Sequence, residues 1–222
     1  MKRVLVSLIC VCMTFAVWAQ NDDFVQYQLD NGLTVYLWED HDQPDVQGWT
    51  VTRAGSIDEP ADATGLAHYL EHMLFKGTDR IGALDWAKEK PLYEQIIALY
   101  DTLALTTDDK AREAVQQRIN EVSREAAQYA ATDEFSNLIQ GIGGEGLNAF
   151  TSYDVTCYMN SFPAYQMERW LTIYADRLTN PLFRSFQAEL ENVFEEYNMC
   201  LDDNSTHVRS FIFGKLYEGH AY

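Results

Sequence analysis

Hydrophobic and polar residues near the start of the chain follow the pattern of short β-strands. Residues 24–38 hold two runs rich in β-branched and aromatic side chains, separated by Asn31-Gly32, a pair typical of a tight hairpin turn. Residues 47–54 continue the pattern, whereas residues 55–63 contain glycine, proline and three acidic residues. We therefore expect a β-hairpin, a third strand and then a loop.

The hydrophobic period changes near residue 86 and becomes that of an α-helix. One set of apolar residues recurs every three or four positions: Leu92, Ile96, Leu99 and Leu103. A second set does the same: Val115, Ile119, Val122, Ala126 and Tyr129. The polar residues 106–109 lie between the two sets and supply a turn with helix-capping side chains. Residues 86–140 are thus predicted to contain a helical hairpin packed on itself.

The remainder of the chain alternates again between strands and helices. Glycine-rich residues 141–146 lack the lysine of a phosphate-binding loop and lead into strands at 147–152 and 155–159, which we expect to be antiparallel. Helices are predicted at residues 163–178 and 186–200, followed by a helical or mixed segment at 208–216. The whole pattern predicts an α+β fold in which an antiparallel or mixed sheet is flanked by helices.

The segment that points most directly to chemistry is His68-Tyr69-Leu70-Glu71-His72. If it is helical, His68 and His72 share one face, so both imidazoles can reach one zinc ion at roughly 2.0–2.1 Å. Glu71 lies beside that face and can take a proton from a metal-bound water. An amphipathic helix with two incidental histidines is the alternative. Because the chain has only five histidines, this arrangement favours a metal site.

The motif and its flanks resemble the pitrilysin/insulinase family of metallopeptidases, which includes the mitochondrial processing peptidases. H-x-x-E-H is the inverted zinc signature, and here it lies between Gly-Leu-Ala at 65–67 and Met-Leu-Phe-Lys-Gly-Thr at 73–78. The resemblance covers nearly all of residues 24–222 apart from one insertion at about 86–140. It implies a processing-peptidase-like metallopeptidase domain that binds one Zn²⁺. The inserted helical hairpin resembles that of some long bacterial members, and its role is open between a chamber wall, a partner contact and a passive elaboration.

The same resemblance implies Glu196 as the third zinc ligand. Residues 189–196 are similar to the family pattern E-R-x-V-V-x-E-E, whose last glutamate binds zinc. Glu189 lies two turns earlier on the same helix face and corresponds to a carboxylate that steadies the site. Leu190 replaces the arginine of the pattern, so Glu195 stays open as an alternative ligand. Without the match, four acidic residues in eight would indicate a solvated helix face.

Residues 148–151, Asn-Ala-Phe-Thr, resemble the family's edge strand, which pairs with extended peptide beside the zinc ion. The likeness implies that Asn148 and Ala149 bind the substrate backbone by β-augmentation, with an ordinary internal strand as the alternative. The implied activity is a zinc endopeptidase that hydrolyses peptides or unfolded polypeptides with Glu71 as the catalytic base. A non-catalytic binding or assembly subunit and a different metal hydrolase are the other candidates.

Residues 1–20 are predicted to be a secretory signal peptide. Two basic residues precede an apolar run at 4–18, and Val17 and Ala19 suit the positions before a cleavage site. The apolar run is short for a membrane anchor, since spanning needs about 20 residues. We therefore expect export to the periplasm, cell envelope or exterior of a bacterium, without membrane association after cleavage.

The acidic balance of the chain excludes some partners. The formal charge is −18 and becomes −20 when cleavage removes Lys2 and Arg3. Nucleic acids and anionic membranes both require positive surface, so neither is expected as a partner. The charge suits basic or neutral peptides, although acidic surfaces commonly serve solubility alone. Cleavage leaves Cys157 and Cys200, which can pair in an oxidising compartment but fit equally well as buried thiols.

The chain is long enough for one sizeable core, with 47% hydrophobic residues. Residues 21–222 are expected to form an N-terminal catalytic metallopeptidase domain, and the end at Tyr222 resembles an interior point of the family's first domain. We therefore expect a fragment of a longer protein, in which a homologous C-terminal half completes the substrate chamber. The three other histidines lie outside any metal spacing and are expected on the surface or in loops: His41, His207 and His220.

Overall fold

The computed structural model describes residues 24–131 and 133–218 and separates the chain into two units, 1–43 and 44–222. In the first unit, β1 (Phe24–Gln28) and β2 (Thr34–Trp38) pair antiparallel, which confirms the predicted hairpin. Gly32 in the connecting turn has a φ of +88°, a conformation that L side chains rarely adopt. The predicted signal peptide lies outside the described residues.

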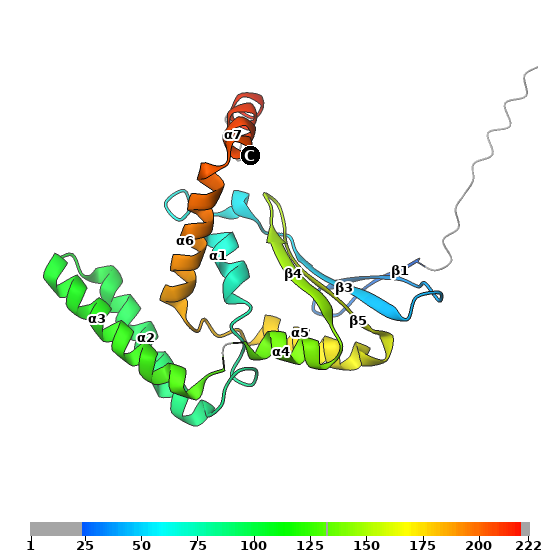
Figure 1. Ribbon diagram of the computed structural model, residues 1–222, viewed down its shortest axis with the longest axis horizontal. Coiled ribbons are helices and arrows are strands. Elements are labelled where there is room, and N and C mark those ends of the chain that lie inside the picture. The colour runs from blue at the N-terminus through cyan, green and yellow to red at the C-terminus, as the bar shows by residue number, and fades with distance from the viewer. Residues whose placement is uncertain (1–23, 132, 219–222) are drawn as a thin grey trace, which may run out of the picture. The chain divides into compact units, whose positions relative to one another are not determined.

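The second unit is built on a three-stranded antiparallel sheet with the order β3–β5–β4 (Figure 1). Its strands are β3 (Asp45–Thr52), β4 (Glu145–Thr151) and β5 (Thr156–Pro163). β5 is the most buried of the three because it has a neighbour on both sides, whereas β4 forms an edge of the sheet. The predicted antiparallel pairing is confirmed. The boundaries differ, since β3 begins at Asp45 rather than 47 and β5 continues past 159 to Pro163.

Seven α-helices lie within the described part of the second unit: α1 (Leu66–Met73), α2 (Trp86–Leu105), α3 (Asp109–Ala126), α4 (Glu134–Gly141), α5 (Met167–Thr179), α6 (Phe186–Asp202) and α7 (Asn204–Leu216). α2 and α3 form the predicted helical hairpin, and Asp108 caps α3 by accepting the backbone N–H of Ala111 at 2.9 Å. The helix predicted at 163–178 begins instead at Met167. Pro163 remains in β5, and a 3-10 turn at Ala164–Gln166 precedes the helix.

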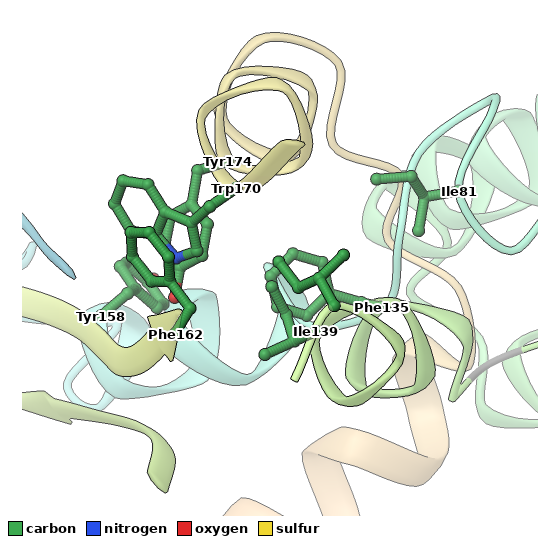
Figure 2. Packing of buried hydrophobic residues seen from close by; sticks show 8 residues of the cluster. Ile81, Phe135, Ile139, Tyr158, Phe162, Trp170 and Tyr174 are labelled. Atoms are coloured by element: carbon green, nitrogen blue, oxygen red, sulfur yellow. The ribbon is translucent and has the colours of Figure 1, made fainter. Parts of the chain in front are cut away.

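The main core lies between the sheet and helices α4 and α5 (Figure 2). Trp170 and Tyr174 of α5 pack on β5, where Asn160 accepts hydrogen bonds from the Trp170 indole (2.9 Å) and the Tyr174 hydroxyl (2.7 Å). The polar groups of Asn160, Trp170 and Tyr174 are therefore paired within the core. α4 contributes Phe135 and Ile139 to the same core. The pattern at 86–140 does not predict α4 as a separate helix, and it belongs to the core rather than to the hairpin.

Arg177 of α5 lies in this core with its side chain almost completely buried, at 1% exposure. Its guanidinium carbon is 4.0–4.5 Å from the ring centroids of Phe75, Phe135 and Tyr158, so aromatic faces surround the charge. Its Nε donates a hydrogen bond of 2.9 Å to the carbonyl of Leu74, just after α1. Burial lowers the pKa of Arg177 to about 10. Arg177 thus ties α5 to the C-terminal end of α1.

Replacing Arg177 with alanine is expected to lower the free energy of unfolding by about 3–5 kcal/mol, as for other large buried side chains. The change empties the aromatic cage and removes the donor to the Leu74 carbonyl. Urea unfolding measures the loss, with Arg169→Ala, an exposed arginine on the same helix, as the control. Lysine at position 177 keeps the charge without the planar guanidinium, so only part of the stability should return. Equal stability of the two alanine variants would contradict this role.

Candidate metal centre

A carboxylate fixes the N-terminus of α1. Glu59 accepts the backbone N–H groups of Gly65 at 2.8 Å and Ala67 at 2.7 Å. Its negative charge also complements the positive end of the helix dipole. The predicted helical segment is confirmed over Leu66–Met73, and the chain then turns through Gly77, which has a φ of +89°.

The buried face of α1 packs against α6, and the two helices lie side by side (Figure 1). Tyr69 and Met73 form a small apolar cluster with Val193. The Tyr69 hydroxyl donates a hydrogen bond of 2.5 Å to the carbonyl of Phe186 at the start of α6. Burial raises the pKa of Tyr69, so its hydroxyl stays protonated. These contacts join segments that are 117 positions apart in the sequence.

His68, His72 and Glu196 bring three potential ligand atoms within 4.8 Å of one another. The histidines lie one turn apart on α1, and Glu196 comes from α6. One carboxylate oxygen of Glu196 is 3.5 Å from the Nε2 atom of each histidine. A tetrahedral zinc ion with bonds of roughly 2.0–2.1 Å separates its ligand atoms by about 3.4 Å. The distances from Glu196 to the two histidines therefore suit zinc.

Glu71 lies between the two histidines in sequence, and its side chain is buried, at 6% exposure. Its Oε2 accepts a hydrogen bond of 2.5 Å from the hydroxyl of Thr151 at the end of β4. This bond orients the carboxylate from the strand side. Thr151 is not among the site residues predicted from the sequence. The alternation of β4 nevertheless places Thr151 on the same face as Ala149, and that alternation is the signal that could have found it.

Glu189 of α6 lies between two basic side chains. Its Oε2 is 3.3 Å from Nδ1 of His72, and its Oε1 pairs with the ammonium of Lys76. Burial by itself would raise the pKa of Glu189, but hydrogen bonds from Lys76 and His72 hold it below its ordinary value. A carboxylate at Nδ1 favours the tautomer that leaves Nε2 free to bind a metal, and Nε2 is the atom that faces Glu196.

A cleft of about 260 Å³ adjoins these residues. Its wall is formed by Glu71, His72, Phe75, Lys76, Leu147, Asn148, Ala149 and Glu189. The two β4 residues predicted to bind substrate, Asn148 and Ala149, therefore line the same cleft as Glu71 and His72. Because β4 is an edge strand, it presents backbone groups toward which an extended chain can add.

The structure brings together all the residues that the sequence analysis places at the site: His68, Glu71, His72, Asn148, Ala149, Glu189 and Glu196. Glu195, the alternative ligand, is exposed and lies outside the three-residue ligand group. Lys76 was missed because only its pairing with Glu189 places it at the site. Local sequence carries no signal for that pairing.

The remaining histidines and the cysteines take no part in this group. His41 is exposed beside Glu39, and His207 is exposed on α7. His220 lies outside the described residues. Cys157 is buried and Cys200 is exposed, and both are free thiols, so the two do not pair in this structure.

Comparison with known proteins identifies the class. The family model described as Insulinase (Peptidase family M16) matches residues 34–89 and 122–222. These ranges make up more than half of the chain, and the chain therefore belongs to this family. The resemblance inferred from the zinc motif is confirmed. The unmatched residues 90–121 lie within the hairpin of α2 and α3.

The curated relatives include zinc proteases much longer than this chain. The chain is 23% identical over 193 residues to the probable zinc protease PqqL of Escherichia coli, covering 84% of this chain and 16% of PqqL. It is 26% identical over 151 residues to the uncharacterized zinc protease SCO5738 of Streptomyces coelicolor, covering 67% of this chain and 22% of that protein. The chain thus spans less than a quarter of the length of either relative.

Solved structures of proteases share the fold. The first half of the periplasmic protease PqqL from Escherichia coli matches with a TM-score of 0.57 at 20% identity, covering 86% of this chain and 32% of that chain. A protease from Helicobacter pylori matches with a TM-score of 0.54 at 20% identity, covering 81% of this chain and 32% of that chain. These likenesses confirm the predicted α+β fold.

Proposed function

We propose that this protein is a zinc-dependent endopeptidase that hydrolyses peptides or unfolded polypeptides. The observation that carries the proposal is the meeting of His68, His72 and Glu196 at the spacing of zinc ligands, beside a cleft lined by Glu71. Membership of the M16 family and the relatives named as zinc proteases support it.

In the proposed mechanism, His68, His72 and Glu196 would hold one Zn²⁺, a ligand set typical of catalytic zinc sites. The bound ion supplies a Lewis acid and a water whose pKa is lowered to about 7. Glu71 is the general base, which would take a proton from the water that attacks the peptide carbonyl. Glu71 then returns the proton to the leaving amine, which completes the cleavage.

Four neighbouring residues position these groups. Thr151 holds the Glu71 carboxylate, and Glu189 holds the His72 ring in the metal-binding tautomer. Asn148 and Ala149 bind the substrate main chain as a strand added to β4. Main-chain recognition accepts many sequences, provided that the substrate is extended. Peptides and unfolded polypeptides meet that condition.

We further propose that the protein is exported and that a homologous C-terminal half completes its substrate chamber. The related PqqL is a periplasmic protease, and this chain covers 32% of the chain in the solved structure of its first half and 17% of the chain in a second solved structure of PqqL. Across residues 24–131 and 133–218, no helix combines the length and hydropathy needed to cross a membrane. The charge of −18 favours peptides over nucleic acid as partners.

Metal removal tests the proposed activity. The full-length protein is expected to contain one zinc ion per catalytic domain and to cleave members of a quenched fluorescent peptide library. Dialysis against a chelator should abolish cleavage and added zinc should restore it, because the nucleophilic water depends on the metal. Zinc binding without cleavage of any peptide would contradict an endopeptidase and would favour a non-catalytic binding or assembly subunit.

A further inference from the structure

The α2–α3 hairpin leaves and rejoins the domain at one point. Ala83 and Ala130 form an antiparallel bridge, and the backbone N–H of Leu84 donates to the carbonyl of Tyr129 at 2.8 Å. The N–H of Ala131 donates to the carbonyl of Gly82, also at 2.8 Å. The base of the hairpin is therefore closed by its own hydrogen bonds, and contacts farther along α2 are not needed to close it.

α2 nevertheless contacts three of the four residues 183–186: Phe183, Arg184 and Phe186. Glu89 accepts a hydrogen bond of 2.9 Å from Nη2 of Arg184, and both side chains are buried, at 2% and 5% exposure. The Tyr93 hydroxyl accepts the backbone N–H of Phe183 at 3.2 Å. The ring of Tyr100 packs against that of Phe186, with centroids 4.9 Å apart. The three contacting residues are spaced along α2, and the residues they contact lie at the start of α6 or just before it.

The segment 183–186 is also the junction between α6 and α1. Arg184 donates to the carbonyls of Lys76 (3.0 Å) and Thr78 (2.7 Å) in the turn after α1. Phe186 accepts the Tyr69 hydroxyl, and its ring lies 5.0 Å from the ring of Tyr69. Tyr100, Phe186 and Tyr69 therefore form a continuous row of edge-on aromatic contacts from α2 to α1.

The start of α6 requires such support. Ser185, the residue before α6, has a φ of +55°, a left-handed conformation that non-glycine residues rarely adopt. It persists only where the surrounding structure holds it, and its neighbours Arg184 and Phe186 are the residues that α2 contacts. Within the described residues, Val193 is the last buried position on α6. The position of Glu196, beyond the last buried residue of α6, thus depends on the contacts that hold the N-terminal part of this helix.

We propose that α2 is a brace for the metal centre, in which Glu89, Tyr93 and Tyr100 are positioning residues that hold α6 where Glu196 meets His68 and His72. This inference rests on the proposed zinc ligation. Glu196 lies ten residues after Phe186, or about 15 Å along the helix. A tilt of about 4° at the start of α6 would move Glu196 by about 1 Å. Zinc sites tolerate only about 0.2 Å in ligand distance.

Zinc affinity of the full-length protein tests the brace, measured by competition with a chromophoric chelator. Tyr100→Ala is expected to weaken zinc binding about tenfold, the lower end of the range for residues that support metal ligands. Tyr100→Phe retains the ring that contacts Phe186 and should bind as wild type. Tyr93→Phe removes only the hydroxyl that accepts the Phe183 N–H, so it is too mild to unfold the chain and should weaken binding less, in the same direction.

Two controls separate the brace from general destabilisation. Ile97→Ala changes a half-exposed residue of α2 and should leave zinc affinity unchanged. Val122→Ala alters a fully buried residue of α3, which makes none of the three contacts, and should lower Tm without weakening zinc binding. The visible spectrum of Co²⁺-substituted Tyr100→Ala should differ from wild type, because the ligand geometry changes.

The outcomes distinguish the two proposals. Wild-type protein that binds no zinc overturns the proposed metal centre and the brace together. Wild-type binding with unchanged affinity in Tyr100→Ala and Tyr93→Phe overturns the brace alone, as does an equal loss in Val122→Ala. Weakened binding in Tyr100→Ala, recovery in Tyr100→Phe and no change in the controls support it.

Discussion

Replacing Glu71 with glutamine is expected to lower the rate of peptide hydrolysis by about 10²–10⁴-fold while zinc remains bound. Glutamine has nearly the same shape, and its side-chain oxygen can still accept the Thr151 hydroxyl. It cannot take a proton from water, so the change removes the base and little else. Because Glu71 is not one of the proposed ligands His68, His72 and Glu196, the metal should be retained.

Metal content and initial rates on a quenched peptide, both measured on the full-length protein, check this result. Glu195→Gln makes the same chemical change at an exposed position of α6 and should alter neither quantity. A Glu71→Gln protein that still cleaves peptides, or that has lost its zinc, would exclude Glu71 from the role of base.

Glu196→Ala is expected to weaken zinc binding by more than about 100-fold, beyond the range for residues that only support ligands. The carboxylate of Glu196 lies 3.5 Å from Nε2 of both histidines, and its loss leaves two protein ligands. Glu195→Ala should bind zinc as wild type. Both variants remove one negative charge from adjacent positions, so a general electrostatic effect on a cation would be nearly equal in the two.

Competition titration with a chelator compares the two variants, and circular dichroism checks that the total helix content is the same in both. Equal zinc affinities would show that Glu196 is not the ligand. Loss of zinc in Glu195→Ala alone would show that Glu195 is the ligand. The sequence leaves this alternative open, because Leu190 stands where the family pattern has arginine.

The sequence predicts those secondary-structure elements whose formation depends on residues close together in the chain. Apolar residues recur with the period of the backbone conformation, strand or helix, in three such elements: the β1–β2 hairpin, the α2–α3 pair and helix α1. One boundary was predicted wrongly because two local preferences compete there. Pro163 suits the first turn of a helix but also suits the end of a strand, and pairing with Asp45 places it in β5.

Membership in the core was less predictable. Phe135 and Ile139 fall within the stretch 86–140 that the helical pattern assigns to the insertion. They belong to the main core because α4 packs beside β5 and α5. An apolar helix face indicates that the face is buried, but the tertiary packing determines which element covers it.

The sequence by itself determined that His68 and His72 share a helix face with Glu71 close by, because the helical period relates residues within a turn. Only the tertiary structure decided which acid faces them. The packing of Tyr69 against Phe186 and α6 turns Glu196 toward the histidines and leaves the adjacent Glu195 exposed. Contacts between residues more than a hundred positions apart depend on side-chain packing, which no local period encodes.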